Sequence, residues 1–481
     1  MCAALALVVA ATSSLALAVP DIARQIDATQ VQTTWIVNAY ALVFAALLLP
    51  IGIAADRFGR RGFLVAGLLV FAGASAVSGY LEEPAAVIAL RGLAGLGAAA
   101  VMPATLSVLV DAYPPERRER AVSIWAAVSG AGAMVGLVSA GLLLDSFWWG
   151  SVQVATGIAG VVVALVCLVV VPRSSNPDLR LDPLGAVLSL LGLAGVMFAV
   201  IQGPDSGWTS AEVLVAGALG VVGLVGFVVH ELRTGAPMLD VRLFSSRLLS
   251  TGSGLVFLQF VAAYAFFLLA PQWLQYLRGQ SPLEAALWFL PFLLGVGPAS
   301  ALAPGLVERF GPGRVGASGM LAMAVALVGM GVLGPLDATL WWFAGSVVLF
   351  AFGFGLAATP GTSLIIGGLP EDRRTLSAAV NDVTREVGGA LGGAIAASVL
   401  LVAYGVRVDD VQGLPSEAAD RAGEGFVQAM GVAQGLPREL GARLAAAARD
   451  AFADGYMIAL FIAAGVLVAG ALLTAWGARR R

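Results

Sequence analysis

The chain alternates between long apolar stretches and short polar connections from one end to the other. Each stretch holds about 20 mostly apolar residues, which is the length an α-helix needs to cross the hydrocarbon core of a bilayer. The pattern therefore predicts fourteen transmembrane helices. They lie near residues 2–19, 34–55, 62–80, 86–110, 121–144, 150–171, 184–203, 211–230, 248–270, 284–307, 313–334, 339–367, 376–404 and 454–477.

Composition points to lipid as the solvent of this chain. Hydrophobic residues make up 59% of it and charged residues 12%, whereas a soluble domain carries about 25% charge. A water-soluble globule could not cover so much apolar surface, so we predict an all-α membrane protein. The net charge of −3 offers no basic face for phosphates, and no nucleic-acid partner is expected.

The basic residues narrow the chemistry further, because all 27 of them are arginine. A chain without lysine has no Walker A loop and no lysine nucleophile. Cys2 and Cys167 lie in apolar runs, and a single histidine argues against a histidine-based metal site. We predict no enzyme, no catalytic residue, no metal and no cofactor; any pumping must draw on an ion gradient or on the substrate's own gradient.

Arginine placement predicts the orientation, since cytoplasmic connections of membrane proteins retain positive charge. With the N-terminus inside, the short outer connections hold only Arg24 and Arg278, beside several acids. We therefore expect both termini in the cytoplasm and the protein in the cytoplasmic membrane. The arginines expected inside are Arg57, Arg60, Arg61, Arg117, Arg118, Arg120, Arg173, Arg180, Arg233, Arg242, Arg247, Arg309, Arg314, Arg373 and Arg374, with Arg479 to Arg481 at the C-terminus.

Two segments stand apart from this regular pattern. The long outer segment, about 405–453, mixes acids and arginines with small helix formers, including the run from Arg443 to Ala453, and indicates a soluble amphipathic cap. The first stretch contains Ala16-Leu17-Ala18, which is similar to a signal-peptidase site. Cleavage there would leave an odd number of crossings, so we expect a retained helix with a few residues before it.

The connection after the second stretch carries a motif. Residues 52–61 read Gly-Ile-Ala-Ala-Asp-Arg-Phe-Gly-Arg-Arg, and residues 304–311 repeat it in part as Pro-Gly-Leu-Val-Glu-Arg-Phe-Gly. The first motif resembles the signature loop of the major facilitator superfamily. The resemblance implies two homologous six-helix bundles, joined by an inserted helix pair at 184–203 and 211–230. We place the bundles at 1–172 and 248–481 and the insert with its linkers at 173–247.

Further matches are similar to the fourteen-helix drug:proton antiporter branch of that superfamily. The resemblance implies export of amphipathic or cationic drugs in exchange for protons, by alternating access, with no enzymatic step. The matching residues are 35–40 (Trp-Ile-Val-Asn-Ala-Tyr), Arg91 with 95–99 (Gly-Leu-Gly-Ala-Ala), 102–103 (Met-Pro), 182–185 (Asp-Pro-Leu-Gly), 202–204 (Gln-Gly-Pro), 243–244 (Leu-Phe), 281–284 (Ser-Pro-Leu-Glu) and 381–389 (Asn-Asp-Val-Thr-Arg-Glu-Val-Gly-Gly).

Two departures from the branch keep other functions open. Ala11 stands where the branch often carries an aspartate, and residues 136–141 read Gly-Leu-Val-Ser-Ala-Gly where it usually has Gly-Pro followed by Gly-Gly. Both modestly favour a transporter of one endogenous metabolite or lipid with weak or no proton coupling. A transport-inactive membrane sensor or scaffold is a third alternative, because the outer segment could bind a partner.

Charged residues within apolar stretches are costly and mark candidate sites. Arg91 lies inside the fourth stretch, and the resemblance links this arginine to proton transfer; alternatively it is a structural cation bound to backbone carbonyls. Asp382, Arg385 and Glu386 share one side of a helix through their i, i+3 and i+4 spacing. We expect Glu386 or Asp382 to carry the proton, the alternative being a salt-bridge set that latches the inner gate.

The signature loop is expected to gate rather than bind. Asp56 can pair with loop arginines in one conformation only, which biases alternating access. The alternative for its arginines is charge retention that fixes topology. The predicted gating residues are Asp56, Arg57, Gly59, Arg60 and Arg61, with Glu308 and Arg309 in the partial repeat.

Amide and aromatic side chains that interrupt the apolar stretches are candidates to line a substrate cavity, because they suit bulky amphiphiles. They are Asn38, Tyr40, Gln259, Tyr264, Gln272, Trp273, Gln275 and Asn381. For Trp273 and Gln272 the alternative is anchoring at the membrane interface. His230, beside Glu231, is expected to be a solvated interfacial residue. The expected partners are an amphipathic small molecule, protons and membrane lipid, and we expect a monomer.

Overall fold

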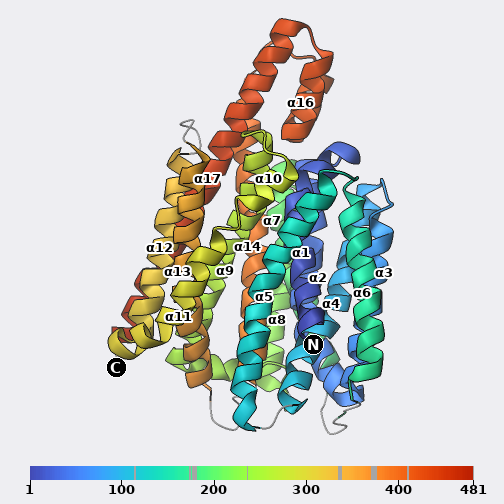
Figure 1. Cartoon of the computed structure of the whole chain (residues 1–481). Coiled ribbons are helices and arrows are strands. Elements are labelled where there is room, and N and C mark those ends of the chain that lie inside the picture. Colours follow the sequence, from blue (N-terminus) through green and yellow to red (C-terminus); the bar gives the residue numbers. More distant parts are fainter. Residues whose placement is uncertain are drawn as a thin grey trace.

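The computed structural model is a bundle of long helices with a smaller helical projection at one end (Figure 1). It describes residues 1–112, 115–172, 175, 181–235, 237–333, 339–369, 376–408 and 411–479, with backbone alone for 106–107, 110–112, 115–127, 129–130, 333, 376–379 and 476–479. These residues contain no strand. Of the arginines used to predict topology, Arg173, Arg180, Arg373, Arg374, Arg480 and Arg481 lie outside the described residues.

The helices follow the predicted apolar stretches. The first eight are α1 (Cys2–Gln25), α2 (Gln30–Phe58), α3 (Arg60–Ser78), α4 (Pro84–Ala112), α5 (Pro115–Leu144), α6 (Gly150–Val170), α7 (Pro183–Ser206) and α8 (Ala211–Arg233). After the 3₁₀ turn η1 (Val241–Ser245) come α9 (Arg247–Tyr276), α10 (Pro282–Leu287), α11 (Phe292–Phe310), α12 (Pro312–Leu333), α13 (Leu340–Gly367), α14 (Leu376–Val408), α15 (Ser416–Gly423), α16 (Phe426–Gly435) and α17 (Arg438–Arg479).

The number of crossings agrees with the prediction. Thirteen stretches are long and apolar enough to cross a bilayer when only the described residues are counted. α5 supplies the fourteenth crossing: it has 30 residues, and its described apolar part is Ala131–Leu144. The all-α membrane architecture predicted from sequence is therefore confirmed.

Two of the predicted stretches differ in detail from the helices that form. The tenth is divided into α10 and α11 by turns at residues 288–291, where the amide of Phe289 bonds three residues back to Ala286. Pro291 ends this break, because its ring cannot continue the preceding turn. The fourteenth stretch is the far part of α17, which starts at Arg438 instead of near residue 454.

Local sequence explains where several helices begin and end. Thr29 and Gln32 form a capping box at the start of α2, and Ser281 and Glu284 form one at α10, which satisfies amides that lack helical partners. In the signature loop, Gly59 separates α2 from α3 with φ 128°, and in its partial repeat Gly311 separates α11 from α12 with φ 84°. Both angles favour glycine, so the repeated Phe-Gly pair builds the same tight turn twice.

Helix packing shows two related halves, with α1 to α6 in one and α9 to α14 with α17 in the other. Within the first half α2 packs on α4, α3 on α4, α1 on α5 and α3 on α6. The second half repeats these pairs as α11 on α13, α12 on α13, α9 on α14 and α12 on α17. Each helix thus meets the same neighbours in both halves, as expected for two six-helix bundles.

Glycines bring the paired helices into close contact in both halves. A methyl group added at Gly97 of α4 would lie 2.6 Å from the carbonyl oxygen of Gly67 in α3. In the other half, one added at Gly353 of α13 would lie 2.5 Å from the carbonyl oxygen of Gly319 in α12. Small residues let backbones approach where lipid supplies no hydrophobic driving force between helices.

The inserted pair, α7 and α8, lies against the joint between the halves. The two helices pack on each other, and α7 also packs on α2 of the first half and α14 of the second. Met197 and Ile201 of α7 share an apolar cluster with Ala41 of α2 and Ala390 of α14. The insert therefore contacts both halves along one side.

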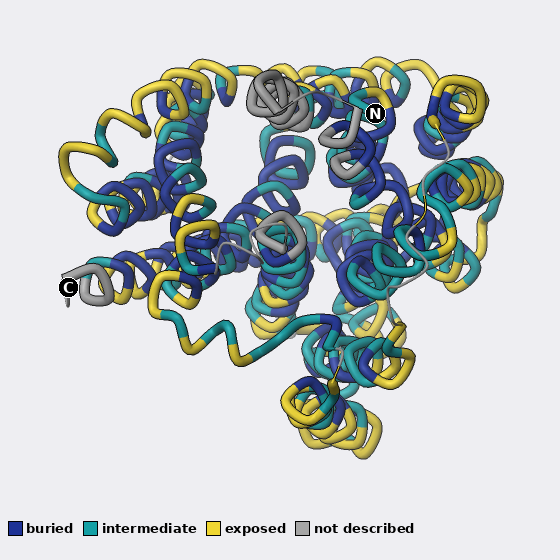
Figure 2. Tube along the Cα trace, turned by 90° about the horizontal axis from the view of Figure 1, so that it is seen from below, coloured by how far each residue is buried: buried dark blue, intermediate teal, exposed yellow. Residues whose placement is uncertain are grey.

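Exposed positions lie mostly along the outer perimeter of the bundle, whereas buried positions face neighbouring helices (Figure 2). The exposed large residues of α6 and α8 are aliphatic: Ile158, Val161, Val162, Leu165, Val166, Leu168, Val169 and Val170 in α6, and Leu214, Val215, Leu219, Val221, Val222, Val225, Val228, Val229 and Leu232 in α8. An aliphatic perimeter is the surface that acyl chains solvate.

Residues 411–453, here called the cap, project from one end of the bundle (Figure 1). They include α15, α16 and the first part of α17, so the run from Arg443 to Ala453 is helical and continuous with the last crossing. We call the end of the bundle beneath it the cap end.

The glycine contacts give a stability prediction. Gly353→Ala places a methyl group against the backbone of α12, so the helices must separate, and we expect a loss of about 1–3 kcal/mol in unfolding free energy. Gly345→Ala is the matched control in α13, because nothing lies within 4 Å of the added carbon. Thermal unfolding of the purified protein in detergent measures both; equal melting temperatures would contradict the contact.

Candidate functional site

The charged side chains of α14 lie against α9. The Nη1 atom of Arg385 is 3.7 Å from Oδ1 of Asp382, and its guanidinium lies 4.8 Å from the ring centroid of Phe260 in α9. Arg385 is therefore held between a carboxylate and an aromatic face, both of which stabilise a cation.

Glu386 is buried, with 9% of its surface exposed. Its one described hydrogen bond is long: the hydroxyl of Tyr264 donates to Oε2 over 3.5 Å. Gly389, one turn further along α14, leaves room for the Tyr264 ring, because an added methyl group would lie 2.7 Å from it. Among the described ion pairs Arg385 binds Asp382 and none includes Glu386, so the two acids have different surroundings.

Arg91 of α4 is 1% exposed. Its Nε atom donates to the backbone carbonyl of Ile36 over 3.2 Å, and its guanidinium lies 4.7 Å from the ring centroid of Tyr40. Its Nη1 atom is buried without a partner among the described atoms. The bond to Ile36 is the kind of contact expected if Arg91 is a structural cation bound to backbone carbonyls. The unpaired Nη1 atom can still donate a hydrogen bond to another group.

Tyr40 lies between the surroundings of Arg91 and those of Glu386, at the joint between the halves. Tyr40 of α2 lies within electrostatic range of both Arg91 and Glu386. Two residues earlier, Asn38 lies directly against α14, since a methyl group added at Gly393 would be 2.9 Å from its Oδ1 atom. Arg91, Tyr40 and Glu386 thus follow one another from the first half to the second.

The predicted cavity residues fall into two groups. Asn38, Tyr40, Gln259, Tyr264 and Asn381 form the group on the side of the buried charges: Nε2 of Gln259 donates to the carbonyl of Phe354, and Thr362 donates to Oδ1 of Asn381 over 3.4 Å. Gln272, Trp273 and Gln275 lie nearer the cap end. Gln272 bonds within its own helix to Leu268, Trp273 stacks between Phe343 and Tyr456, and Gln275 donates to the carbonyl of Leu17 across the joint.

The signature loop and its repeat keep their charges locally. Nε of Arg60 pairs with Oδ1 of Asp56 one helical turn away across Gly59. The guanidinium of Arg57 lies 5.3 Å from the ring of Phe58, and that of Arg309 lies 5.2 Å from the ring of Phe310, so the two loops match here too. The ion pairs within the described chain include neither Arg61 nor Glu308.

His230 differs from its expectation as a solvated residue. Its Nε2 atom lies 2.8 Å and 2.9 Å from the two carboxylate oxygens of Asp182, the residue that caps α7. Glu231 is fully buried beside them and accepts a hydrogen bond from the amide of Leu239. These contacts join the ends of α7 and α8, which the adjacent positions of His230 and Glu231 in the sequence did not reveal.

Hydrogen bonds between the halves gather at the cap end of the described structure. Asp145, directly after α5, accepts from the hydroxyl of Ser281 and the amide of Leu283 at the start of α10, both at 3.3 Å. The Gln275 bond to Leu17 lies at the same end. This end of the joint is therefore closed.

The cap covers the closed end and reaches both halves. Arg421 pairs with Asp27 in the link between α1 and α2, and Nε2 of Gln428 donates to the carbonyl of Ala28 over 2.8 Å. On the other side, Phe426 stacks on Tyr276 of α9 at 4.8 Å between centroids. The sequence did not predict these contacts. Of the residues beneath the cap, it singled out Gln275 as a cavity candidate and Arg24 as an arginine of a short outer connection.

Two related six-helix halves, closed at one end and carrying buried charge at their joint, define a membrane transporter. Residues 1–393 match the Major Facilitator Superfamily, and the chain belongs to that family. The methyl viologen resistance protein SmvA of Salmonella typhimurium is 30% identical, over 94% of this chain and 92% of the relative. The multidrug efflux pump LfrA of Mycolicibacterium smegmatis is 31% identical, over 97% and 92%.

Other comparisons agree with this family. The tetracenomycin C resistance and export protein of Streptomyces glaucescens is 31% identical, over 95% of this chain and 87% of the relative. Among solved structures, a bacterial homologue of the human lysosomal transporter Spinster has a TM-score of 0.65 at 18% identity, covering 99% of this chain and 97% of that one. PepTSo has the same TM-score at 15% identity. The fold is thus that of the superfamily.

The signature loop gives a kinetic prediction. Asp56→Asn weakens the pair with Arg60 at a helix end, so we expect slower transport with substrate affinity largely unchanged. Transport rate and equilibrium binding of one fluorescent substrate, measured on the same protein preparation, separate the two effects. Lost affinity with normal turnover would contradict a gating role.

Proposed function

We propose that the chain exports amphipathic and cationic compounds across the cytoplasmic membrane in exchange for protons, by alternating access. The observation that carries the proposal is the unequal pairing of the two acids in α14. Asp382 has Arg385 as its partner, whereas Glu386 is buried with only a long hydrogen bond from Tyr264. The resistance and export relatives named above support the substrate class.

Burial without an ion pair among the described residues makes Glu386 the better proton carrier of the two. An ionised carboxylate in a low-dielectric site costs several kcal/mol unless it is paired, so a proton offsets that cost. When the proton leaves, the charge lies within electrostatic range of Arg385 in the same helix and of Tyr40, the neighbour of Arg91, across the joint. Proton exchange at Glu386 thereby changes the electrostatic interaction between the halves.

The closed cap end supports alternating access. We place this end outside, because the short connections there hold acids and only Arg24 and Arg278, which also puts both termini in the cytoplasm. With the outer end closed, a compound can enter only from the cytoplasmic side. Opening of the outer end requires the hydrogen bonds of Asp145 and Gln275 across the joint to break. A monomer contains both halves and completes this cycle alone.

A transporter of one endogenous metabolite or lipid, without proton coupling, is the second candidate. Ala11 and Leu137 favour it, because both are buried apolar residues at positions where the drug exporter pattern differs. The neutral variants below distinguish it, since uncoupled transport is insensitive to them.

The proton role is tested by neutralising each acid. In vesicles, Glu386→Gln is expected to abolish substrate-driven proton movement, because the amide at position 386 cannot bind and release the proton. Asp382→Asn removes the partner of Arg385 and is expected to lower the melting temperature while leaving some coupling. Lumenal pH and substrate flux are recorded together; unchanged coupling in both variants removes the proton-carrying hypothesis.

Closure at the cap end is tested at Asp145. Asp145→Ala removes two hydrogen bonds across the joint, each worth about 1 kcal/mol, so the ratio of open to closed protein is expected to rise about thirtyfold. Distances between spin labels on the outer ends of α5 and α10 report that ratio. Asp454→Ala is the control, since its partner Arg407 joins α14 to α17 within one half; the same change there would argue against a specific clasp at Asp145.

A further inference from the structure

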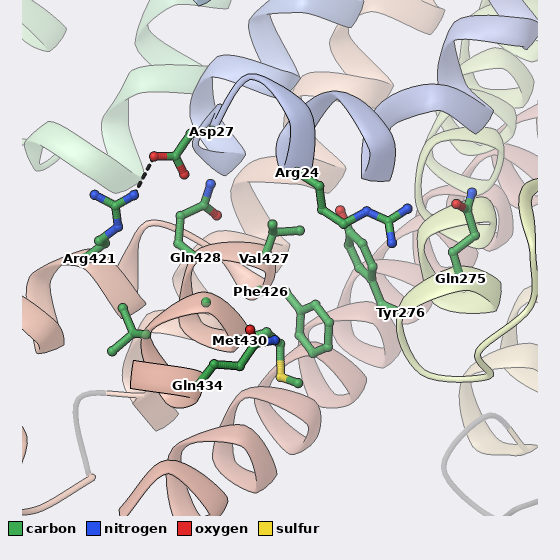
Figure 3. Close-up of a pocket in the computed structure, with 12 residues that line it drawn as sticks. Arg24, Asp27, Gln275, Tyr276, Arg421, Phe426, Val427, Gln428, Met430 and Gln434 are labelled. Carbon is green, nitrogen blue, oxygen red and sulfur yellow. Dashed lines mark hydrogen bonds and ion pairs between the residues drawn. The ribbon is translucent and has the colours of Figure 1, made fainter. Parts of the chain in front are cut away.

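A cavity of about 640 Å³ lies beneath the cap, apart from the charged residues of α14. Its walls come from three places: the link between α1 and α2 (Arg24, Asp27), the end of α9 (Gln275, Tyr276), and α15–α16 (Arg421 and residues 426–434). Figure 3 shows Arg24, Tyr276 and Phe426 side by side, with the Asp27–Arg421 pair at one edge. Its volume is in the range that holds drug-sized molecules.

Aromatic rings form one wall of this cap pocket. Tyr276 and Phe426 stack with 4.8 Å between ring centroids, and Phe452 of α17 packs on both, at 5.3 Å and 5.6 Å. Met430 adds a thioether beside them. Because three helices fix these rings, a planar apolar group can bind without ordering the wall first.

The positive charges that line the cap pocket are compensated. The lining arginines are both paired with acids, Arg24 with Asp21 over 2.6 Å and Arg421 with Asp27. Neither arginine therefore presents an uncompensated positive charge to a bound cation.

Two acceptor atoms near the cap pocket are buried with no hydrogen-bond partner in the described structure. One is Oε1 of Gln275, whose amide nitrogen bonds to Leu17, and the other is Oδ2 of Asp21, which lies within electrostatic range of Tyr276. Buried acceptors without donors are costly, so a ligand that brings positive charge or donors relieves them. Rings with acids nearby are also the combination that binds organic cations.

We propose that the cap pocket is a second binding site, for amphipathic aromatic cations, reached from the side of the membrane that the cap occupies. The proposal deepens the proposed export function and rests on its orientation and substrate class. Bound compound would contact the α1–α2 link of one half and α9 of the other. By linkage it favours the state in which the cap end is closed, so exported compound that accumulates outside slows further opening.

The test uses propidium, an aromatic dication that does not cross membranes, with the full-length protein in right-side-out vesicles. Saturable binding, followed by fluorescence polarisation, is expected for the wild type. Tyr276→Leu removes a ring of the wall and is expected to weaken binding about tenfold, whereas Tyr276→Phe keeps the ring and retains most of it. Propidium is also expected to reduce the open population reported by the α5–α10 spin labels.

Two further variants serve as controls for propidium binding. Trp341→Leu is the matched control, because this ring at the start of α13 is 76% exposed and lies outside the cap pocket; it should bind propidium normally. Glu386→Gln should also bind normally, so failure of the export proposal leaves this one standing. Absence of saturable binding, or equal binding by Tyr276→Leu and wild type when both are monodisperse, overturns the proposal.

Discussion

Hydrocarbon cannot hydrogen-bond a peptide group, and every level of this structure follows from that constraint. Each crossing must satisfy its own amides, so the membrane part of the described chain is helical apart from the turns at residues 288–291. Because lipid is as apolar as leucine, helices associate by close packing rather than by hiding surface. Glycine pairs such as Gly67 with Gly97 and Gly319 with Gly353 supply that contact at matching places in both halves.

The same constraint decides where charge is tolerated. Arg385 and Asp382 neutralise each other, and Arg91 uses a backbone carbonyl and an aromatic face. Glu386 has no described ion pair and only a long hydrogen bond from Tyr264, and its helix α14 packs on α2 across the joint. A proton would neutralise it, which is why the proposed coupling and the proposed movement of the halves involve the same residue.

Sequence alone predicted the features that depend on solvent and on local spacing. The fourteen crossings came from apolar length, and the shared side of Asp382, Arg385 and Glu386 came from helical period. What sequence missed depends on contacts between distant residues. Gln428 bonds to Ala28 and Gln275 to Leu17, and no pattern in either segment records its partner. Residue type suggested an interface for His230, and for Trp273 a substrate cavity with interface anchoring as the alternative. Contacts with Asp182, and with Phe343 and Tyr456, determine their surroundings instead.

The inserted helices have a consequence for how oily molecules reach the interior. Since α7 packs on both α2 and α14, and the hydroxyl of Ser398 in α14 bonds to the carbonyl of Val200 in α7, this seam between the halves is shielded from acyl chains. A compound dissolved in the bilayer therefore meets the inserted helices on that side and not the joint between the halves. On the proposed export function, it reaches the joint from water or from the opposite side, where α5 and α10 meet without an added helix.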